Sequence, residues 1–205
     1  MIKLYGYPRT RSARVAWALE EASAEYEYIP INLQAGEHKK PAFLKINPFG
    51  KIPALIDGDL ILSESAAICT YIAEKFPAAK LIPNTSQGRA EYFHWLFFVV
   101  SELETHLWTA AKHDRILPED KRVPAVIKTC EWEFAKAATL LSQHLSQHAY
   151  LANNEFSAAD IVCVSILQWA HHAGFALDDI LLVYMNRLSE RPALTKARKR
   201  EAEAI

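Results

Sequence analysis

Residues 47–55 read Asn-Pro-Phe-Gly-Lys-Ile-Pro-Ala-Leu and join a polar turn to a short apolar run. Pro53 opens the expected strand, 53–57, where its missing N–H removes no essential ladder hydrogen bond. The Ile52-Pro53 bond is a candidate for the cis form, because the trans preference is small before proline. With that bond cis, we expect the backbone of Ile52 to turn outward and pair with an extended peptide.

Around this stretch, the first 78 residues mix strand and helix patterns. Gly58-Asp59 separates two short apolar runs and predicts a hairpin turn. The expected order is βαβ and then ββα, so the first two strands are parallel and the hairpin adds an antiparallel edge. The expected elements are strands at 2–5, 26–31, 53–57 and 60–62, a helix at 13–21, and a helix opened by Ser63 that stops before Pro77.

The second half of the chain carries only helical patterns. Residues 77–88 are rich in proline, asparagine, serine and glycine, which is a linker composition. We therefore predict an α/β domain at 1–78, a linker at 79–86 and an all-helical domain at 87–205. The helices are expected at 87–111, 126–148, 157–172 and 178–190, with a short one after Pro192.

A helix-start signal lies at Phe156-Ser157-Ala158-Ala159-Asp160-Ile161. Ser157 can cap the helix while Asp160 reaches back to the Ser157 amide. The helix that follows is apolar on nearly every face, so it should be buried and its first amides must be satisfied by the cap. Asp160 is therefore interpreted as a folding residue.

Composition excludes several classes of protein. Hydrophobic residues make up 51% of the 205, and the formal net charge is -1 at a pI of about 6.7, so nothing indicates nucleic-acid binding. The most apolar run, 161–170, is too short to span a bilayer, and the N-terminus has no secretory signal pattern. Three widely spaced cysteines without a C-x-x-C motif predict a reducing, cytoplasmic environment.

The segment Tyr5 to Ser12 lies between the first expected strand and helix, at the carboxyl end of a parallel strand, where open α/β sheets bind ligands. Thr10 and Ser12 put hydroxyls at the helix start, near Arg9, Arg11 and Arg14 and in positive potential. The alternative is that one of these hydroxyls only caps the helix. Both interpretations stay open from these residues alone.

Two further segments add candidate ligand contacts. Glu37-His38-Lys39-Lys40 precedes Pro41, and its basic groups could meet a carboxylate. Ser63-Glu64-Ser65-Ala66 stands at an expected helix start, where amides and hydroxyls bind carboxylates and Glu64 could pair with a neighbouring amine. Each segment alone also fits a solvated loop or a helix cap.

Taken together, these motifs resemble the cytosolic glutathione transferases, in particular the serine-type, phi-like and related bacterial members. The resemblance covers Gly36 to Lys39, residues 47–55 and residues 64–68, and it continues into Phe156 to Ile161. It implies a thioredoxin-like α/β fold for the first domain, an all-helical second domain, and a glutathione transferase that stabilises the glutathione thiolate for attack on hydrophobic electrophiles. It also implies a homodimer, with glutathione and a small hydrophobic electrophile as ligands.

The resemblance assigns roles to individual residues. Thr10 would activate the thiol, with Ser12 as the second candidate, and Thr10 departs from the family's serine. Tyr5 and Tyr7 keep a tyrosine-type activation open. The expected glutathione contacts are His38, Lys39 and Lys51 at the glycine end, Ile52 and Pro53 at the cysteinyl unit, and Glu64 and Ser65 at the γ-glutamyl end.

The second-substrate pocket is expected to use Tyr7 together with His106, Trp108 and Lys112 from the aromatic-rich helix. His144 and His148 have helical i, i+4 spacing, but no third ligand is apparent, so no metal is expected. Two alternatives remain open: a glutathione-dependent peroxidase or disulfide reductase on the same site, and a non-catalytic binding module. Retained glutathione contacts favour an enzyme over the module.

Overall fold

The computed structural model describes all 205 residues and divides into two compact units. The first unit contains residues 1–82 together with 190–205, and the second contains residues 83–189. These two units are defined by which residues pack against one another. The domain boundary expected from the sequence, with a linker at 79–86, stays a prediction. None of the helices combines the length and the hydropathy that a bilayer crossing requires.

The first unit is built on a four-stranded sheet in the order β2-β1-β3-β4. β1 (Ile2–Gly6) is parallel to β2 (Tyr26–Pro30), and β3 (Ala54–Asp57) is antiparallel to both β1 and β4 (Leu60–Ser63). This confirms the expected βαβ and ββα order. The hairpin turns at Gly58, whose φ of +61° is the left-handed conformation that glycine adopts without a Cβ penalty.

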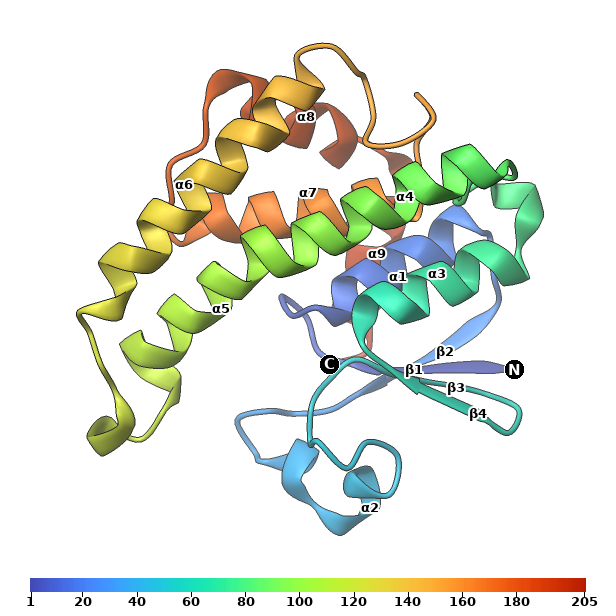
Figure 1. Ribbon diagram of the computed structural model, residues 1–205. Coiled ribbons are helices and arrows are strands. Elements are labelled where there is room, and N and C mark those ends of the chain that lie inside the picture. Colours follow the sequence, from blue (N-terminus) through green and yellow to red (C-terminus); the bar gives the residue numbers. More distant parts are fainter. The chain divides into compact units, whose positions relative to one another are not determined.

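Helices cover the sheet of the first unit. α1 (Ser12–Glu21) and α3 (Ser65–Lys75) lie on one side of the sheet, and the short α2 (Pro41–Leu44) lies on the other (Figure 1). α1 buries a continuous set of side chains, from Val15 to Leu19, against the sheet and its neighbouring helices. On the opposite side, Phe43 packs with Ile31 and Ala54.

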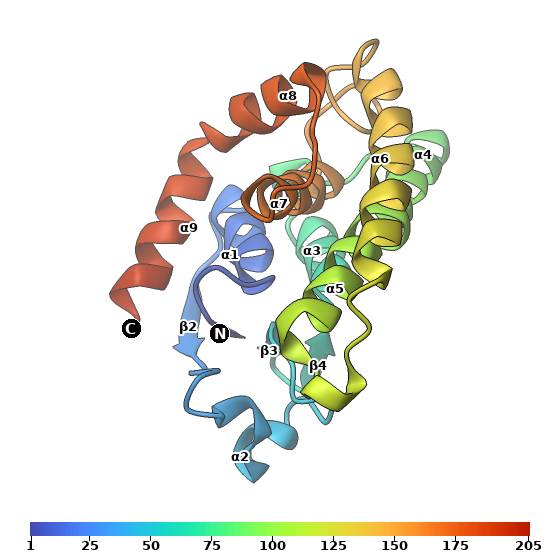
Figure 2. The ribbon, with the colours of Figure 1, turned by 90° about the vertical axis from the view of Figure 1, so that its left-hand side faces the viewer.

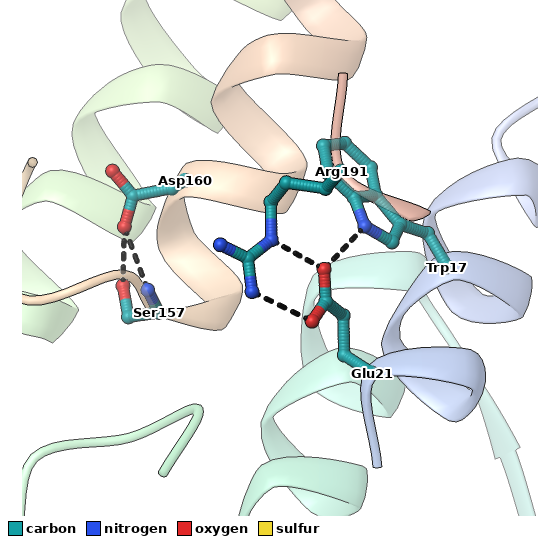
Figure 3. Close-up of polar contacts among 5 residues, drawn as sticks. All are labelled: Trp17, Glu21, Ser157, Asp160 and Arg191. Atoms are coloured by element: carbon teal, nitrogen blue, oxygen red, sulfur yellow. Dashed lines mark hydrogen bonds and ion pairs between the residues drawn. The ribbon is translucent and has the colours of Figure 1, made fainter. Parts of the chain in front are cut away.

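The last helix, α9 (Pro192–Glu203), also belongs to the first unit and runs beside α1 (Figure 2). Glu21 of α1 accepts from Arg191 Nε at 2.5 Å and Nη2 at 2.8 Å, and from the Trp17 indole at 2.9 Å (Figure 3). Glu20 accepts from Arg200 at 2.9 Å. Two arginine–glutamate pairs therefore fasten α9 along α1.

The second unit is helical, as predicted. α4 (Ser86–Phe98) continues through a π-helical stretch, Val99–Glu104, into α5 (Thr105–Ala111), where a single uninterrupted α-helix was expected over 87–111. A π-helical turn is wider than an α-helical turn. The buried apolar residues nevertheless keep the three- and four-residue spacing of an ordinary α-helix, so the sequence pattern does not reveal the π-helical stretch; they are Leu96, Val99, Leu103 and Leu107. The remaining helices are α6 (Val126–Leu145), α7 (Ala158–His172) and α8 (Asp179–Ser189).

α7 is the buried helix that the sequence predicts, with nearly every residue from Ala158 to Ala170 buried. Its capping box is formed: Asp160 Oδ2 accepts from the Ser157 N–H at 2.8 Å and hydroxyl at 2.9 Å (Figure 3). Asp160 Oδ1 accepts from the Leu151 N–H at 3.0 Å and the Tyr184 hydroxyl at 2.7 Å. Four donors thus surround this carboxyl.

Candidate active site

The loop between β1 and α1 folds its two hydroxyls together. Thr10 Oγ1 and Ser12 Oγ lie 2.6 Å apart. Ser12 Oγ accepts from the Tyr7 N–H at 3.0 Å and lies 2.9 Å from the Tyr7 carbonyl, to which Thr10 Oγ1 donates at 2.7 Å. Ser12 is fully buried, whereas Thr10 is partly exposed. The tight turn of 7–12 therefore leaves Thr10 as the outer of the two hydroxyls.

Neither hydroxyl residue is the N-cap of α1. The helix begins at Ser12, and its N-cap is Arg11, which makes no side-chain capping bond. Thr10 Oγ1 does accept the Ser12 N–H, at 3.2 Å, so it meets one of the free amides of the first turn. Arg9, at φ +60°, bends the chain so that Thr10 can reach that amide.

The start of α3 differs from the sequence expectation. Ser63 ends β4, and the helix begins at Ser65 rather than at Ser63. Glu64 separates the two with φ +67° and ψ +108°, a backbone conformation that costs about 1–3 kcal/mol for a residue with a Cβ. Such strain concentrates at ligand-binding sites, and here it stands at the residue expected to meet the γ-glutamyl end.

Ser65 is buried and accepts a hydrogen bond from Arg14 Nη1 at 3.1 Å. Arg14, on α1, is only 2% exposed, so a guanidinium lies beneath the start of α3. The positive charge and the positive end of the α3 dipole act in the same direction and favour an anion at Ser65.

The expected glycine-end residues come from two neighbouring loops. Asn47 is buried and shapes the second loop, donating to the Lys51 carbonyl at 2.6 Å and accepting from the Phe49 N–H at 3.1 Å. The two loops approach so closely at Gly50, with φ +60°, that a Cβ there would lie 3.0 Å from the His38 carbonyl. The backbone of His38 therefore lies next to Gly50, the residue before Lys51.

Individual groups of these loops differ in their surroundings. His38 Nδ1 is buried and has no hydrogen-bond partner, whereas Lys39 and Lys51 are exposed. The Ile52-Pro53 bond is cis, as the sequence indicates, and Pro53 is buried at the entry to β3.

In the second unit, His106 and Trp108 lie on α5, and Lys112 follows it in a second π-helical stretch, Lys112–Ile116. All three side chains are partly exposed, as is Tyr7 in the first unit. Their assignment to the pocket of a second substrate stays a prediction. His144 and His148 stack at 4.4 Å between ring centroids, but no group of three metal-ligating side chains forms.

Sequence reasoning missed Tyr28 and Glu201, which lie near Ser12. The Tyr28 hydroxyl, on β2, donates to Glu201 Oε1 at 3.2 Å, and a Cβ at Gly6 would lie 2.9 Å from its oxygen and 2.7 Å from Ser12 Oγ. Glu201 is only 3% exposed on α9. No local signal marks Glu201, because it directly follows the charged segment Lys196 to Arg200 and looks like one more residue of a solvated helix face.

The chain thus combines a thioredoxin-like α/β unit, with two hydroxyls at the start of its first helix, and a helical unit. Family models match both halves: "Glutathione S-transferase, N-terminal domain" at residues 1–74 and "Glutathione S-transferase, C-terminal domain" at residues 104–200. The chain belongs to the glutathione S-transferase family.

Individual relatives agree with the family models. Glutathione S-transferase 3 of Zea mays is 37% identical over 78% of this chain and 73% of its own. A glutathione S-transferase from Xylella fastidiosa superposes with a TM-score of 0.88 at 27% identity, over 98% of this chain and 99% of its own. Glutathione transferase URE2P6 from Phanerochaete chrysosporium, solved in complex with oxidized glutathione, gives a TM-score of 0.84 at 29% identity, over 100% and 97%. No match favours the peroxidase, reductase or binding-module alternatives.

Proposed function

We propose that the chain binds glutathione on its first unit and that the Thr10 hydroxyl stabilises the thiolate for attack on a small hydrophobic electrophile. The observation that carries this proposal is the contrast between the two hydroxyls. Ser12 Oγ is buried, with the Tyr7 N–H, the Tyr7 carbonyl and Thr10 Oγ1 within 3.0 Å. Thr10 Oγ1 has as many partners, the Tyr7 carbonyl, Ser12 Oγ and the Ser12 N–H, but Thr10 is partly exposed, so its single proton can turn from the Tyr7 carbonyl to a bound sulfur.

Thr10 can take the activating role at modest energetic cost. A free thiol has a pKa of about 8.5, and lowering it by about two needs roughly 2.7 kcal/mol. A hydrogen bond to a charged group contributes about 1.5–3 kcal/mol, which is nearly sufficient by itself. The α1 N-terminus adds positive potential from its free amides. The mechanism therefore requires neither a metal nor a separate general base.

The remaining glutathione contacts follow from the same unit. The γ-glutamyl carboxylate fits the start of α3, where Arg14 lies beneath Ser65 and Glu64 can pair with the amine. The Ile52 backbone, beside Pro53, is proposed to pair with the cysteinyl unit. The glycine carboxylate fits the basic side chains of His38, Lys39 and Lys51, and the buried Nδ1 of His38 supports a polar partner there.

The chain is also proposed to act as a homodimer in the cytoplasm. The dimer rests on the family resemblance, and the compartment on three cysteines that are all free and buried. Sedimentation at several concentrations tests the dimer, since a monomer throughout the range would contradict it.

The test of thiol activation is a pH titration of bound glutathione, followed by the ultraviolet absorbance of the thiolate. In the native chain the pKa of the bound thiol should lie well below that of free glutathione. Thr10→Ala should raise that pKa and lower kcat/KM roughly 10- to 100-fold, because one charge-assisted hydrogen bond is lost. Thr10→Ser should retain most of the activity.

Two comparisons complete this test. Full activity in Thr10→Ala, with loss in Ser12→Ala at unchanged stability, would reassign the role to Ser12. Parallel assays with an aryl halide, an organic peroxide and a mixed disulfide separate transferase from peroxidase and reductase activity. Highest turnover on the aryl halide is the expected result.

A further inference from the structure

The second unit contains a groove that the proposed glutathione chemistry does not use. It lies where the end of α6 packs beside α8 and has a volume of about 600 Å³. None of the residues that line it is among the expected glutathione contacts or the expected second-substrate pocket. Small-molecule sites have volumes in this range, so the groove is a candidate for a separate binding site.

The walls of the groove are largely apolar. Leu145 of α6 and Tyr184 of α8 line it and are buried. Ile180 and Val183 line it from positions one turn apart on α8, and they are 39% and 65% exposed. An apolar ligand in the groove would cover side chains that now face water, which is favourable in proportion to the apolar area removed from water.

Arg187 marks one end of the groove and is held in a fixed orientation. Its guanidinium carbon lies 5.0 Å from the centroid of the Tyr150 ring and 5.9 Å from that of the Tyr184 ring, which is the range of a cation–π contact. Its Nη2 donates to the Ala149 carbonyl. A guanidinium has five N–H donors, and no carboxylate of the chain pairs with this one. The remaining donors suit a carboxylate, which arginine binds through two parallel hydrogen bonds.

Asp179 lines the groove in the first turn of α8, eight residues before Arg187. Its carboxylate is exposed and makes no ion pair within the chain. Asp178 stands directly before it and accepts from the Leu181 N–H at 3.0 Å. Two negative charges therefore lie near this end of the groove, and they favour a cationic group on a ligand.

The separation of the two charged ends limits the length of the ligand. Eight residues of an α-helix rise about 12 Å, and Ile180 and Val183 lie within that stretch. An extended peptide covers about 3.3–3.6 Å per residue, so about three or four residues span the distance. A linear peptide also carries an ammonium group at one end and a carboxylate at the other, with side chains between them.

We propose that the groove between α6 and α8 binds a short apolar peptide with free termini. The peptide carboxylate lies on Arg187, its ammonium group lies at Asp179, and its side chains pack against Ile180 and Val183. The proposal is independent of the role of Thr10 and involves no covalent step. Glutathione suits this groove poorly, because it carries two carboxylates and no large apolar side chain.

The test uses the tripeptide Leu-Ala-Leu and follows the amide NMR signals of Ala149 and Val183 in the native chain. S-hexylglutathione is added to occupy the proposed active site. Both signals should shift saturably, with a dissociation constant of about 1 mM or tighter. Amidation of the peptide's carboxyl terminus should weaken binding about tenfold, because a charge-assisted contact is lost. Acetylation of its amino terminus should weaken binding about threefold, because Asp179 is exposed.

Two variants assign the two ends of the peptide. In Arg187→Gln, amidation of the peptide should no longer weaken binding, and in Asp179→Asn the same should hold for acetylation. The matched controls are Arg115→Gln and Asp114→Asn, which remove an exposed ion pair of the same unit that does not line the groove. Both controls should retain the effects of amidation and acetylation.

Arg187 also holds the Ala149 carbonyl, so Val183→Gln provides an independent test of the groove. Val183 is largely exposed, so this variant should keep its fold while binding Leu-Ala-Leu about threefold more weakly. Equal affinities for the free, amidated and acetylated peptides, or no saturable shift in the native chain, would overturn the proposal. Displacement of the peptide by S-hexylglutathione would also overturn it, because the peptide would then occupy the second-substrate pocket.

Discussion

Asp160 and Glu201 are both buried carboxyls on helices, one in each unit, yet their surroundings differ completely. Asp160 is fully buried and accepts from four donors, two on each oxygen. Glu201 is 3% exposed and has one donor, the Tyr28 hydroxyl. Burial raises the pKa of both carboxyls, and only Asp160 has enough donors to oppose the rise substantially. The number of donors, rather than burial, separates a structural carboxyl from one suited to titrate.

The same substitution at both carboxyls tests this difference most strongly. In Asp160→Asn one oxygen becomes an NH2 group, so either the Leu151 or the Ser157 backbone N–H loses its acceptor. The expected loss in the free energy of unfolding is roughly 3–5 kcal/mol, measured by urea denaturation. Glu201→Gln at pH 5 should cost less than about 1 kcal/mol. Similar losses at both sites would show that the donor count is unimportant.

The pH dependence of stability distinguishes the two carboxyls next. The pKa of Glu201 is raised in the folded chain from 4.5 to about 7, so the folded state holds its proton more tightly than the unfolded state. Native stability should therefore fall as pH rises from about 4.5 through 7. Glu201→Gln does not titrate, so its stability relative to the native chain should rise by roughly 2–3 kcal/mol between pH 5 and pH 8.

Urea titrations of both proteins at the two pH values provide this measurement. Glu20→Gln is the control and should change by the same amount at both pH values. A pH-independent difference for Glu201→Gln would mean that Glu201 is ionised throughout the range and that its burial makes no contribution to the pH dependence of stability.

A smaller effect is expected from a methyl group placed between β1 and the side chains of Ser12 and Tyr28. In Gly6→Ala the new Cβ would meet Ser12 Cβ at 2.5 Å as well as both hydroxyls, and Ser12 is held by the α1 backbone. We expect a loss of about 1–3 kcal/mol from overpacking and a raised pKa of bound glutathione. Gly58→Ala meets no atom within 4 Å and serves as the control; it should destabilise the left-handed turn without moving the thiol pKa.

The least effect is expected at the fastening of α9. Arg191→Lys replaces a bidentate contact to Glu21 by a point charge, and the pair is partly exposed, so the loss should be about 1 kcal/mol. Lys199→Ala, whose ammonium lies 3.7 Å from Glu203 on the surface, should stay within about 0.5 kcal/mol. A larger effect at Lys199 would mean that the surface charges of α9, rather than its contacts to α1, hold it.

The sequence predicts most of the fold because its elements depend on local signals. The Gly58-Asp59 turn, the capping box at Ser157 and Asp160, and the apolar pattern of α7 are all visible in short windows and are confirmed. The predicted start of α3, at Ser63, was wrong by two residues. The helix begins after the strained backbone of Glu64, which depends on the tertiary structure and which no local sequence pattern indicates. The π-helical stretch was not predicted, because its buried apolar residues, Val99 and Leu103, have the spacing of an ordinary α-helix.

The site shows the same limit. Thr10 and Ser12 are recognisable as hydroxyls at a helix start, but which of them faces outward depends on the contacts of Tyr7 with both. Tyr28 and Glu201 are separated by 173 positions in the chain, and only the packing of α9 on α1 and β2 brings them together. No pattern of residue types near Glu201 distinguishes it from a solvated glutamate.

The placement of the three cysteines has a consequence for the reaction of this protein with electrophiles. Cys69, Cys130 and Cys163 are all buried, and burial raises the pKa of Cys69 to about 12 and that of Cys130 above its usual value. Buried thiols with high pKa values react slowly, because the thiolate is the nucleophile. Electrophiles should therefore react slowly with the chain itself, and a maleimide dye added to the folded protein should consume bound glutathione while leaving the polypeptide unlabelled.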